Sequence, residues 1–303
     1  MTDLQLERAD PTFLGVAQVS PHELHAGDRA ILGIPHGVPY PAAGLTAGCA
    51  DAPAAIRRRS LRMARFVGHW DFDIGGPMLP PDGPHVVDCG DVPGAPDDGG
   101  GNSQRAEAAV RDILERGAVP IVLGGDDSVP IPVLRAYADH EPITVLQVDA
   151  HLDFRDEVAG VRDGYSSPMR RASEMRHVER IVQVGLRGVG SAREADVADA
   201  RAVGNVLVTA RELRAAGVER VLTRLAPDGP IFVSFDADAL DPSVCPAVSA
   251  PAPGGLAYDE AVDLLRGIGP RLAGAAFTEL VPALDLNELS ALVVARLVVR
   301  LLG

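Results

Sequence analysis

Two stretches of the chain, TVLQVDAHLD (144–153) and IFVSFDADALDP (231–242), decide which fold is expected. Each begins as an apolar run typical of a buried parallel strand, and each changes to acidic residues where the strand should end. A third apolar run, VPIVL (119–123), is followed by the acidic segment GGDDS (124–128). In open α/β sheets, ligands bind just beyond the carboxyl ends of the strands. The three segments therefore predict a polar site at one edge of a parallel sheet.

The rest of the chain alternates short apolar runs with segments of helical periodicity, which predicts a parallel sheet with helices on both faces. Further strands are expected at 30–35, 86–89, 180–184, 205–209 and 275–280. Helices are expected at 53–63, 104–117, 132–139, 211–225, 259–272 and 287–302, and an irregular loop at 90–102. No linker is apparent, so we interpret residues 1–303 as one α/β domain.

Composition narrows the class of protein. Of the 303 residues, 47% are hydrophobic and only 4% are aromatic, which suits aliphatic strands covered by helices. The net charge of −14 disfavours nucleic acid and anionic membranes as partners, because both attract basic patches. Three scattered cysteines do not predict a disulfide framework. We find no signal peptide and no apolar run long enough to span a bilayer, so a cytoplasmic location is expected.

The acidic segments have the composition of a metal site. At a strand end, the alternating Asp149, His151 and Asp153 would point to one side, and Asp236 and Asp238 repeat this spacing on another strand. Oxygen ligands with one imidazole suit Mn²⁺, and also Fe²⁺ or Mg²⁺. Carboxylates this close together need cations to stay ionised. Two metal ions about 3.5–4 Å apart, sharing carboxylates, would satisfy the set.

In these motifs the sequence resembles the arginase–agmatinase (ureohydrolase) family, over nearly its whole length. The family's motifs GGDHS, DAHxD and SFDxDxxDP stand here as GGDDS (124–128), DAHLD (149–153) and SFDADALDP (234–242). Flanking segments are also agmatinase-like: DCGDVPG (88–94), VQVGLRG (182–188), PAPGGL (251–256) and TELVP (278–282). The resemblance implies a three-layer α/β/α fold with a central, mostly parallel eight-stranded sheet. It also implies two Mn²⁺ ions per chain and a bridging hydroxide that attacks a guanidinium carbon, releasing urea and an amine.

The resemblance also implies a role for each matching residue. Asp149 and Asp236 would bridge the two ions, and His151 and Asp238 would complete the shell of one ion. Asp153 would bind the other ion. Glu279 stands where the family places a carboxylate that receives the guanidinium, and a charge-assisted bidentate contact suits that role.

Two positions depart from the family pattern. The histidine of GGDHS is Asp127 here, and an aspartate can also bind Mn²⁺. The ligand shell would then bring five negative charges instead of four against the four positive charges of two ions. The extra charge should raise the pKa of the bridging water.

The second departure lies in the segment GYSSPMRRA (164–172), where agmatinases carry YxHGxPFRRA. Aligning PMRRA with PFRRA places Tyr165 at the position of the histidine that shuttles protons. Tyrosine, with a pKa near 10, is a poorer acid–base group at neutral pH.

We therefore expect a binuclear metal-dependent hydrolase of a guanidino or amidino compound, agmatinase-like. The resemblance also implies a homo-oligomer, a trimer or hexamer. Two alternatives stay open. One is a non-catalytic or regulatory homologue, which Asp127 and Tyr165 would fit. The other is a hydrolase of the same fold that acts on a formimino compound or another amidine.

Overall fold

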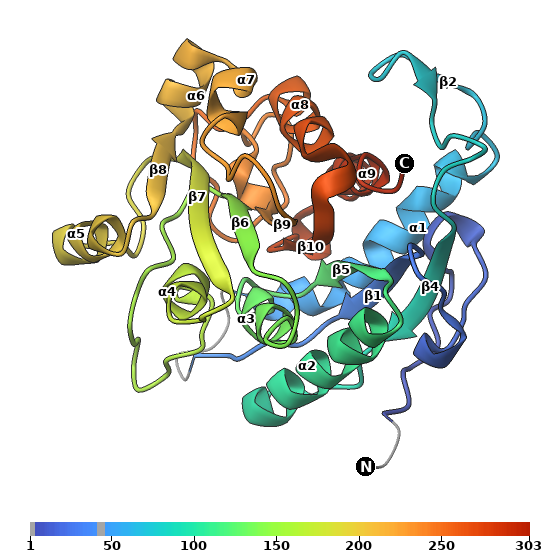
Figure 1. Cartoon of the computed structure of the whole chain (residues 1–303), viewed down its shortest axis with the longest axis horizontal. Helices are drawn as coiled ribbons and strands as arrows, with labels where there is room; N and C mark the ends of the chain where they lie inside the picture. Colours follow the sequence, from blue (N-terminus) through green and yellow to red (C-terminus); the bar gives the residue numbers. More distant parts are fainter. Residues whose placement is uncertain (1–3, 41–45) are drawn as a thin grey trace.

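The computed structural model describes residues 4–40 and 46–303. Its main sheet has eight parallel strands in the order β4-β1-β5-β10-β9-β6-β7-β8 (Figure 1). The strands are β1 (Arg29–Ile34), β4 (Val86–Asp91), β5 (Val119–Gly124), β6 (Ile143–Val148), β7 (Val178–Leu186), β8 (Val206–Thr209), β9 (Ile231–Asp236) and β10 (Leu272–Thr278). A separate antiparallel hairpin pairs β2 (Trp70–Asp71) with β3 (Gly76–Pro77). The predicted central sheet is confirmed.

Helices cover both faces of this sheet (Figure 1). One face carries α1 (Ala52–Ala64), α6 (Ala210–Ala216), α7 (Val218–Leu222), α8 (Tyr258–Ile268) and α9 (Leu289–Val299). The other carries α2 (Gly99–Glu115), α3 (Pro130–Arg135), α4 (Pro168–Ser173) and α5 (Glu194–Ala202). Neighbouring strand residues point into opposite cores, Ile31 into the first and Leu32 into the second. This double burial explains the continuous apolar runs of the strands.

Three sequence expectations were wrong in their boundaries. The loop expected at 90–102 ends early, because Asp98 caps α2 by accepting a hydrogen bond of 3.1 Å from the N–H of Gly101. The helix expected at 211–225 is broken at Gly217, whose φ of 83° is incompatible with a helix. The helix expected at 259–272 ends at Ile268, and Leu272 already begins β10. The helices α4 and α5 were not predicted. The one-domain interpretation stays a prediction.

The four central strands β5, β10, β9 and β6 end at the same level. Leu123 of β5 is in register with Phe277 of β10. Phe277 is in register with Phe235 of β9, and Phe235 is in register with Val148 of β6. The residues that follow these strands therefore meet at one edge of the sheet. Because this edge lies between two helical layers, side chains placed there are screened from solvent.

Candidate active site

Each of the four central strands delivers a buried carboxylate to the shared edge. Asp127 follows β5, Glu279 follows β10, Asp236 ends β9, and Asp149 follows β6. The exposed fraction of these residues does not exceed 7%. The structure thus brings together the acidic segments that the sequence places up to about half the chain apart.

The remaining side chains of the acidic motifs are positioned by short turns and not by extended strands. Asp149 Oδ1 accepts a hydrogen bond of 2.6 Å from the N–H of His151, and Asp236 Oδ1 accepts one of 2.7 Å from the N–H of Asp238. Such turns, in which an aspartate bonds to the backbone two residues on, reverse the chain locally. Asp153 adopts a φ of 45°, which is uncommon outside glycine. The expected strand-like alternation of 149–153 was therefore wrong, because β6 ends at Val148.

The candidate metal ligands form two overlapping groups. Asp149, His151 and Asp238 offer ligand atoms within 4.8 Å of one another, and so do Asp127, Asp149 and Asp236. Asp149 belongs to both groups, as a shared carboxylate would. Asp153 belongs to neither group, although it lies close to Asp149 on the same loop.

The electrostatics of these carboxylates fit a cation. Burial, and then the neighbouring carboxylates, raise the pKa of Asp127, Asp149 and Asp236 well above the usual aspartate value. Asp127 Oδ1 accepts a hydrogen bond of 2.7 Å from Thr278 Oγ1, but Asp127 Oδ2 is buried with no hydrogen-bond partner. A buried carboxylate oxygen without a partner is costly unless a cation is there to receive it. The donor set therefore fits a pair of hard divalent ions.

His151 belongs to the ligand group that it forms with Asp149 and Asp238. Its Nδ1 lies 3.0 Å from Asp238 Oδ2, and this hydrogen bond is the main cause that raises the pKa of His151 to about 9. Gly190 packs over the ring, where a Cβ atom would come within 2.5 Å of His151 Cδ2. The loop that holds Gly190 therefore needs a glycine in order to cover the imidazole.

Glu279 lies beside Asp127 at the same edge of the sheet. Its φ of 62° turns the chain directly after β10, and Oε1 accepts a hydrogen bond of 2.8 Å from the N–H of Asp127. Cys49 Sγ lies 3.8 Å from the other oxygen, Oε2. Burial, followed by repulsion from Asp126, raises the pKa of Glu279 to about 8. A cationic group bound beside it would be needed to ionise it fully at neutral pH.

A cavity of about 210 Å³ opens onto these side chains. Its wall is completed by small and polar residues: Thr46, Ser166, Val189, Gly190, Ser191, Ser249 and Ala250. Tyr165 also lines it, half-buried, with its ring 4.4 Å from the ring of Tyr40. Burial raises the pKa of Tyr165, so its hydroxyl is protonated at neutral pH. All the predicted site residues line this cavity except Asp149, which is fully buried.

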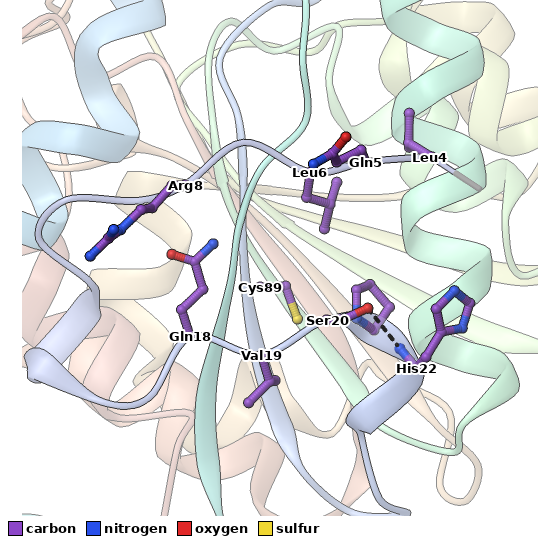
Figure 2. A pocket seen from close by; sticks show the side chains of 10 residues that line it. Leu4, Gln5, Leu6, Arg8, Gln18, Val19, Ser20, His22 and Cys89 are labelled. Atoms are coloured by element: carbon purple, nitrogen blue, oxygen red, sulfur yellow. Dashed lines mark hydrogen bonds between the residues drawn. The ribbon is translucent and has the colours of Figure 1, made fainter. Parts of the chain in front are cut away.

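A larger hollow, of about 740 Å³, lies elsewhere (Figure 2). It is bounded by two N-terminal segments, which contribute Leu6, Arg8 and Gln18 among others, and by Cys89 of β4. Figure 2 shows the hydrogen bond by which the N–H of His22 donates to Ser20 at its rim. Its described lining has no carboxylate, so it does not resemble the acidic edge of the sheet.

Comparison with known proteins agrees with this geometry. The family model described as "Arginase family" matches residues 28–303. A guanidinopropionase from Pseudomonas aeruginosa is 33% identical, with 96% of this chain and 90% of that protein covered. An agmatinase from Salmonella paratyphi B is 31% identical, with 91% and 86% covered. The solved structure of proclavaminate amidino hydrolase from Streptomyces clavuligerus superposes with a TM-score of 0.83 at 27% identity, covering 99% of this chain and 98% of that one.

The fold and the acidic edge define a hydrolase of the arginase fold. This chain belongs to the arginase family. The predicted enzyme class, a family hydrolase acting on C–N bonds of guanidino compounds, is confirmed, and so is the family's dependence on a metal pair. Within the described residues, no helix is long and apolar enough to cross a membrane.

Sequence reasoning missed three residues that hold the site together. Thr278 bonds to Asp127, Cys49 contacts Glu279, and Gln147 donates hydrogen bonds to Asp149 and Asp153. Gln147 was detectable, because on a strand it shares a face with Asp149 two residues later. Cys49 was not, since 230 residues separate it from Glu279.

Proposed function

We propose that this protein is a two-manganese hydrolase of a guanidino compound, agmatinase-like, that releases urea and an amine. The observation that carries the proposal is the buried carboxylate edge, in which Asp127 Oδ2 lacks any partner and Glu279 faces the same cavity. An acidic pocket of this kind suits a guanidinium, which is planar, cationic and rich in N–H donors.

We assign the proposed ligands as follows. Asp149 and Asp236 would be shared by the two ions, His151 and Asp238 would complete one site, and Asp127 and Asp153 would complete the other. Five carboxylates and one imidazole favour Mn²⁺. When bound, such an ion pair would lower the pKa of a coordinated water and so supply a hydroxide, with the carboxylate of Asp127 keeping that pKa higher than an imidazole ligand would.

Glu279 is proposed to orient the substrate. Its Oε1 is fixed by the N–H of Asp127, and a carboxylate oxygen has a second lone pair to accept a guanidinium N–H. The bound guanidinium would lower the pKa of Glu279 from about 8 and thus ionise it as the substrate enters. The guanidinium carbon is then held above the acidic edge for attack by water.

Tyr165 is proposed to serve the leaving amine. Breakage of the C–N bond requires a proton on the amine nitrogen, and the hydroxyl of Tyr165 is a protonated donor in the cavity wall. Tyrosine releases its proton less readily than histidine, so we expect this step to limit the rate near neutral pH.

The charge of the cavity favours a substrate whose tail is cationic or uncharged. The chain has no lysine, and the described lining of the cavity includes no arginine. The nearby Arg187 is engaged with the backbone oxygens of Asp238, Leu240 and Ala252, and Arg155 with that of Ser191. Residues 41–45, outside the described part, are Pro, Ala, Ala, Gly and Leu. Among the described lining residues, a carboxylate tail would therefore meet no arginine or lysine, and it would experience the field of several acids.

The test is turnover by the Mn²⁺-loaded protein on a panel of matched chain length: agmatine, 4-guanidinobutyrate and an uncharged alkylguanidine, with urea and amine measured together. We expect agmatine or the alkylguanidine to have the highest kcat/KM. A preference for 4-guanidinobutyrate would contradict the argument about the tail. Release of ammonia from a formimino compound, without urea from any guanidine, would favour the amidine alternative. No turnover despite bound metal would favour a non-catalytic homologue.

We further propose a cytoplasmic homo-oligomer, a trimer or hexamer. Support comes from large apolar side chains exposed on the chain, since Trp70 is 62% and Phe72 is 91% exposed on the β2–β3 hairpin. Exposed aromatic residues of this size are typical of subunit interfaces. Light scattering after size-exclusion chromatography tests the assembly, and a monomer at micromolar concentration would contradict it.

A further inference from the structure

A buried amide side chain on strand β6 is hydrogen-bonded to two of the acidic residues of the site. Gln147, on β6, is 1% exposed. Its Nε2 donates one hydrogen bond of 2.6 Å to Asp149 Oδ2 and another of 3.1 Å to Asp153 Oδ2. A primary amide has two N–H hydrogens, so both are used on the two carboxylates. One nitrogen thereby fixes the separation of Asp149 and Asp153.

Gln147 is itself held by a second amide. Gln183, its register partner on β7, is fully buried. Gln183 Nε2 donates to Gln147 Oε1 at 2.6 Å and to the backbone oxygen of Leu152 at 2.7 Å. Asn205, before β8, donates in turn from Nδ2 to Gln183 Oε1 at 2.9 Å. Three amides thus form one chain across neighbouring strands.

The direction of this chain is uniform. Asn205 donates to the oxygen of Gln183, Gln183 donates to the oxygen of Gln147, and Gln147 donates to the site. The last donor, Gln147 Nε2, faces the carboxylates of Asp149 and Asp153, which can only accept hydrogen bonds when they are ionised. Rotating the amide of Gln147 by half a turn would set its oxygen against Asp149 and Asp153 and would face the nitrogen of Gln183 with another donor. The network therefore allows one orientation, in which polarisation along the chain strengthens the final donor.

We infer that Gln147 is a positioning residue that sets the affinity of the proposed metal pair, by orienting Asp149 and Asp153, and that Gln183 and Asn205 lock its orientation. This inference rests on the metal ligands assigned above. A neutral amide suits the role, because it holds two carboxylates without adding a positive charge that would oppose bound cations. Partners behind metal ligands typically change metal affinity by about 10- to 100-fold when removed.

The test is titration calorimetry with Mn²⁺ on the full-length protein and on Gln147→Met, which keeps the volume of the side chain and removes the amide. We expect the affinity of at least one Mn²⁺ ion to fall by about 10-fold or more. Thr144→Val is the matched control on the same strand, since Thr144 Oγ1 is buried without a hydrogen-bond partner. The control should bind Mn²⁺ as the parent does.

A purely structural role would give a different result. In that case Gln147→Met would lower the unfolding temperature of the metal-stripped protein yet bind Mn²⁺ with the parent's affinity, and the inference would be overturned. If Gln147→Met does not fold, Asn205→Leu at the edge of the network provides the test. It should weaken Mn²⁺ binding in the same direction by a smaller factor, and parental affinity would overturn the inference. A parent protein that binds no Mn²⁺ would overturn the proposed function as well.

Discussion

The backbone N–H of Asp127 donates a hydrogen bond of 2.8 Å to Glu279 Oε1, so one contact links a proposed metal ligand to the proposed guanidinium receptor. A second contact runs the other way, from Thr278 Oγ1 to Asp127 Oδ1 at 2.7 Å. The loops after β5 and β10 are therefore braced against each other. Because the Glu279 contact uses the backbone of Asp127, substitutions of the two side chains can be separated by experiment.

Glu279→Gln should impair substrate binding and leave the metal pair in place. The amide oxygen can still accept from the N–H of Asp127, but the charge that pairs with the guanidinium is lost. Charged hydrogen bonds contribute about 1.5–3 kcal/mol, so kcat/KM should fall roughly 10- to 100-fold. Kinetics and Mn²⁺ titration on the same preparation check this. Loss of Mn²⁺ together with activity would instead make Glu279 a metal ligand.

Asp149→Asn and Asp153→Asn should differ in how many ions they lose. Asp149 belongs to both ligand groups, whereas Asp153 belongs to neither and is assigned to one ion only. We expect Asp149→Asn to abolish tight binding of both Mn²⁺ ions and Asp153→Asn to weaken mainly one. Calorimetric titration resolves the two binding steps. Equal losses in the two variants would contradict the assignment of Asp149 as a shared ligand.

The parts of the fold that follow from local pattern were predictable. The apolar runs at 119–123, 144–148 and 231–235 placed three of the four central strands closely, because parallel strands buried on both faces are continuously apolar. Helix ends were less predictable. They depend on single residues, such as the positive φ of Gly217 and the side-chain cap from Asp98.

For the site, the sequence predicted which acids meet but not how they are held. The order of β5, β10, β9 and β6 in the sheet, which brings Glu279 beside Asp127, is set by long-range pairing that no local pattern encodes. The same holds for Cys49, whose contact with Glu279 spans 230 residues. The turns at Asp149 and Asp236 replaced the expected strand alternation, because backbone N–H groups beyond a strand end need other acceptors.

Asp127→His should shift the activity profile toward lower pH. The additional carboxylate makes deprotonation of a metal-bound water harder, and an imidazole ligand would remove that charge. The alkaline rise in kcat should therefore begin at lower pH in the variant, provided that the variant still binds both metal ions. Profiles of kcat for both proteins with the best substrate check this. A parent profile that is already flat from neutral pH, and unchanged by the substitution, would contradict the charge argument.

Protein stripped of metal should become less stable as the pH rises. Glu279 has a folded-state pKa of about 8 against an ordinary 4.5, and the pKa values of Asp127, Asp149 and Asp236 are raised in the same direction. A group whose pKa is higher in the folded than in the unfolded state stabilises the fold fully at pH values below its unfolded-state pKa. This stabilisation is lost as the pH rises through its folded-state pKa. The unfolding temperature should therefore fall between about pH 5 and pH 8.

Mn²⁺ should reverse this trend, because metals bind the deprotonated ligands and compete with protons. Calorimetric unfolding across this pH range, with Mn²⁺ and with a chelator, is the measurement. An unfolding temperature that does not depend on pH in the chelated protein would mean that the acidic edge is not protonated as described.

The most direct test of a two-metal site that includes Asp127 is the number of Mn²⁺ ions held per chain after loading and gel filtration, measured by elemental analysis. The account predicts two ions in the parent protein, because the two ligand groups share Asp149 and each has further ligands of its own. One ion per chain would mean that Asp127 fails as a ligand, and the absence of any tightly held ion would contradict the account.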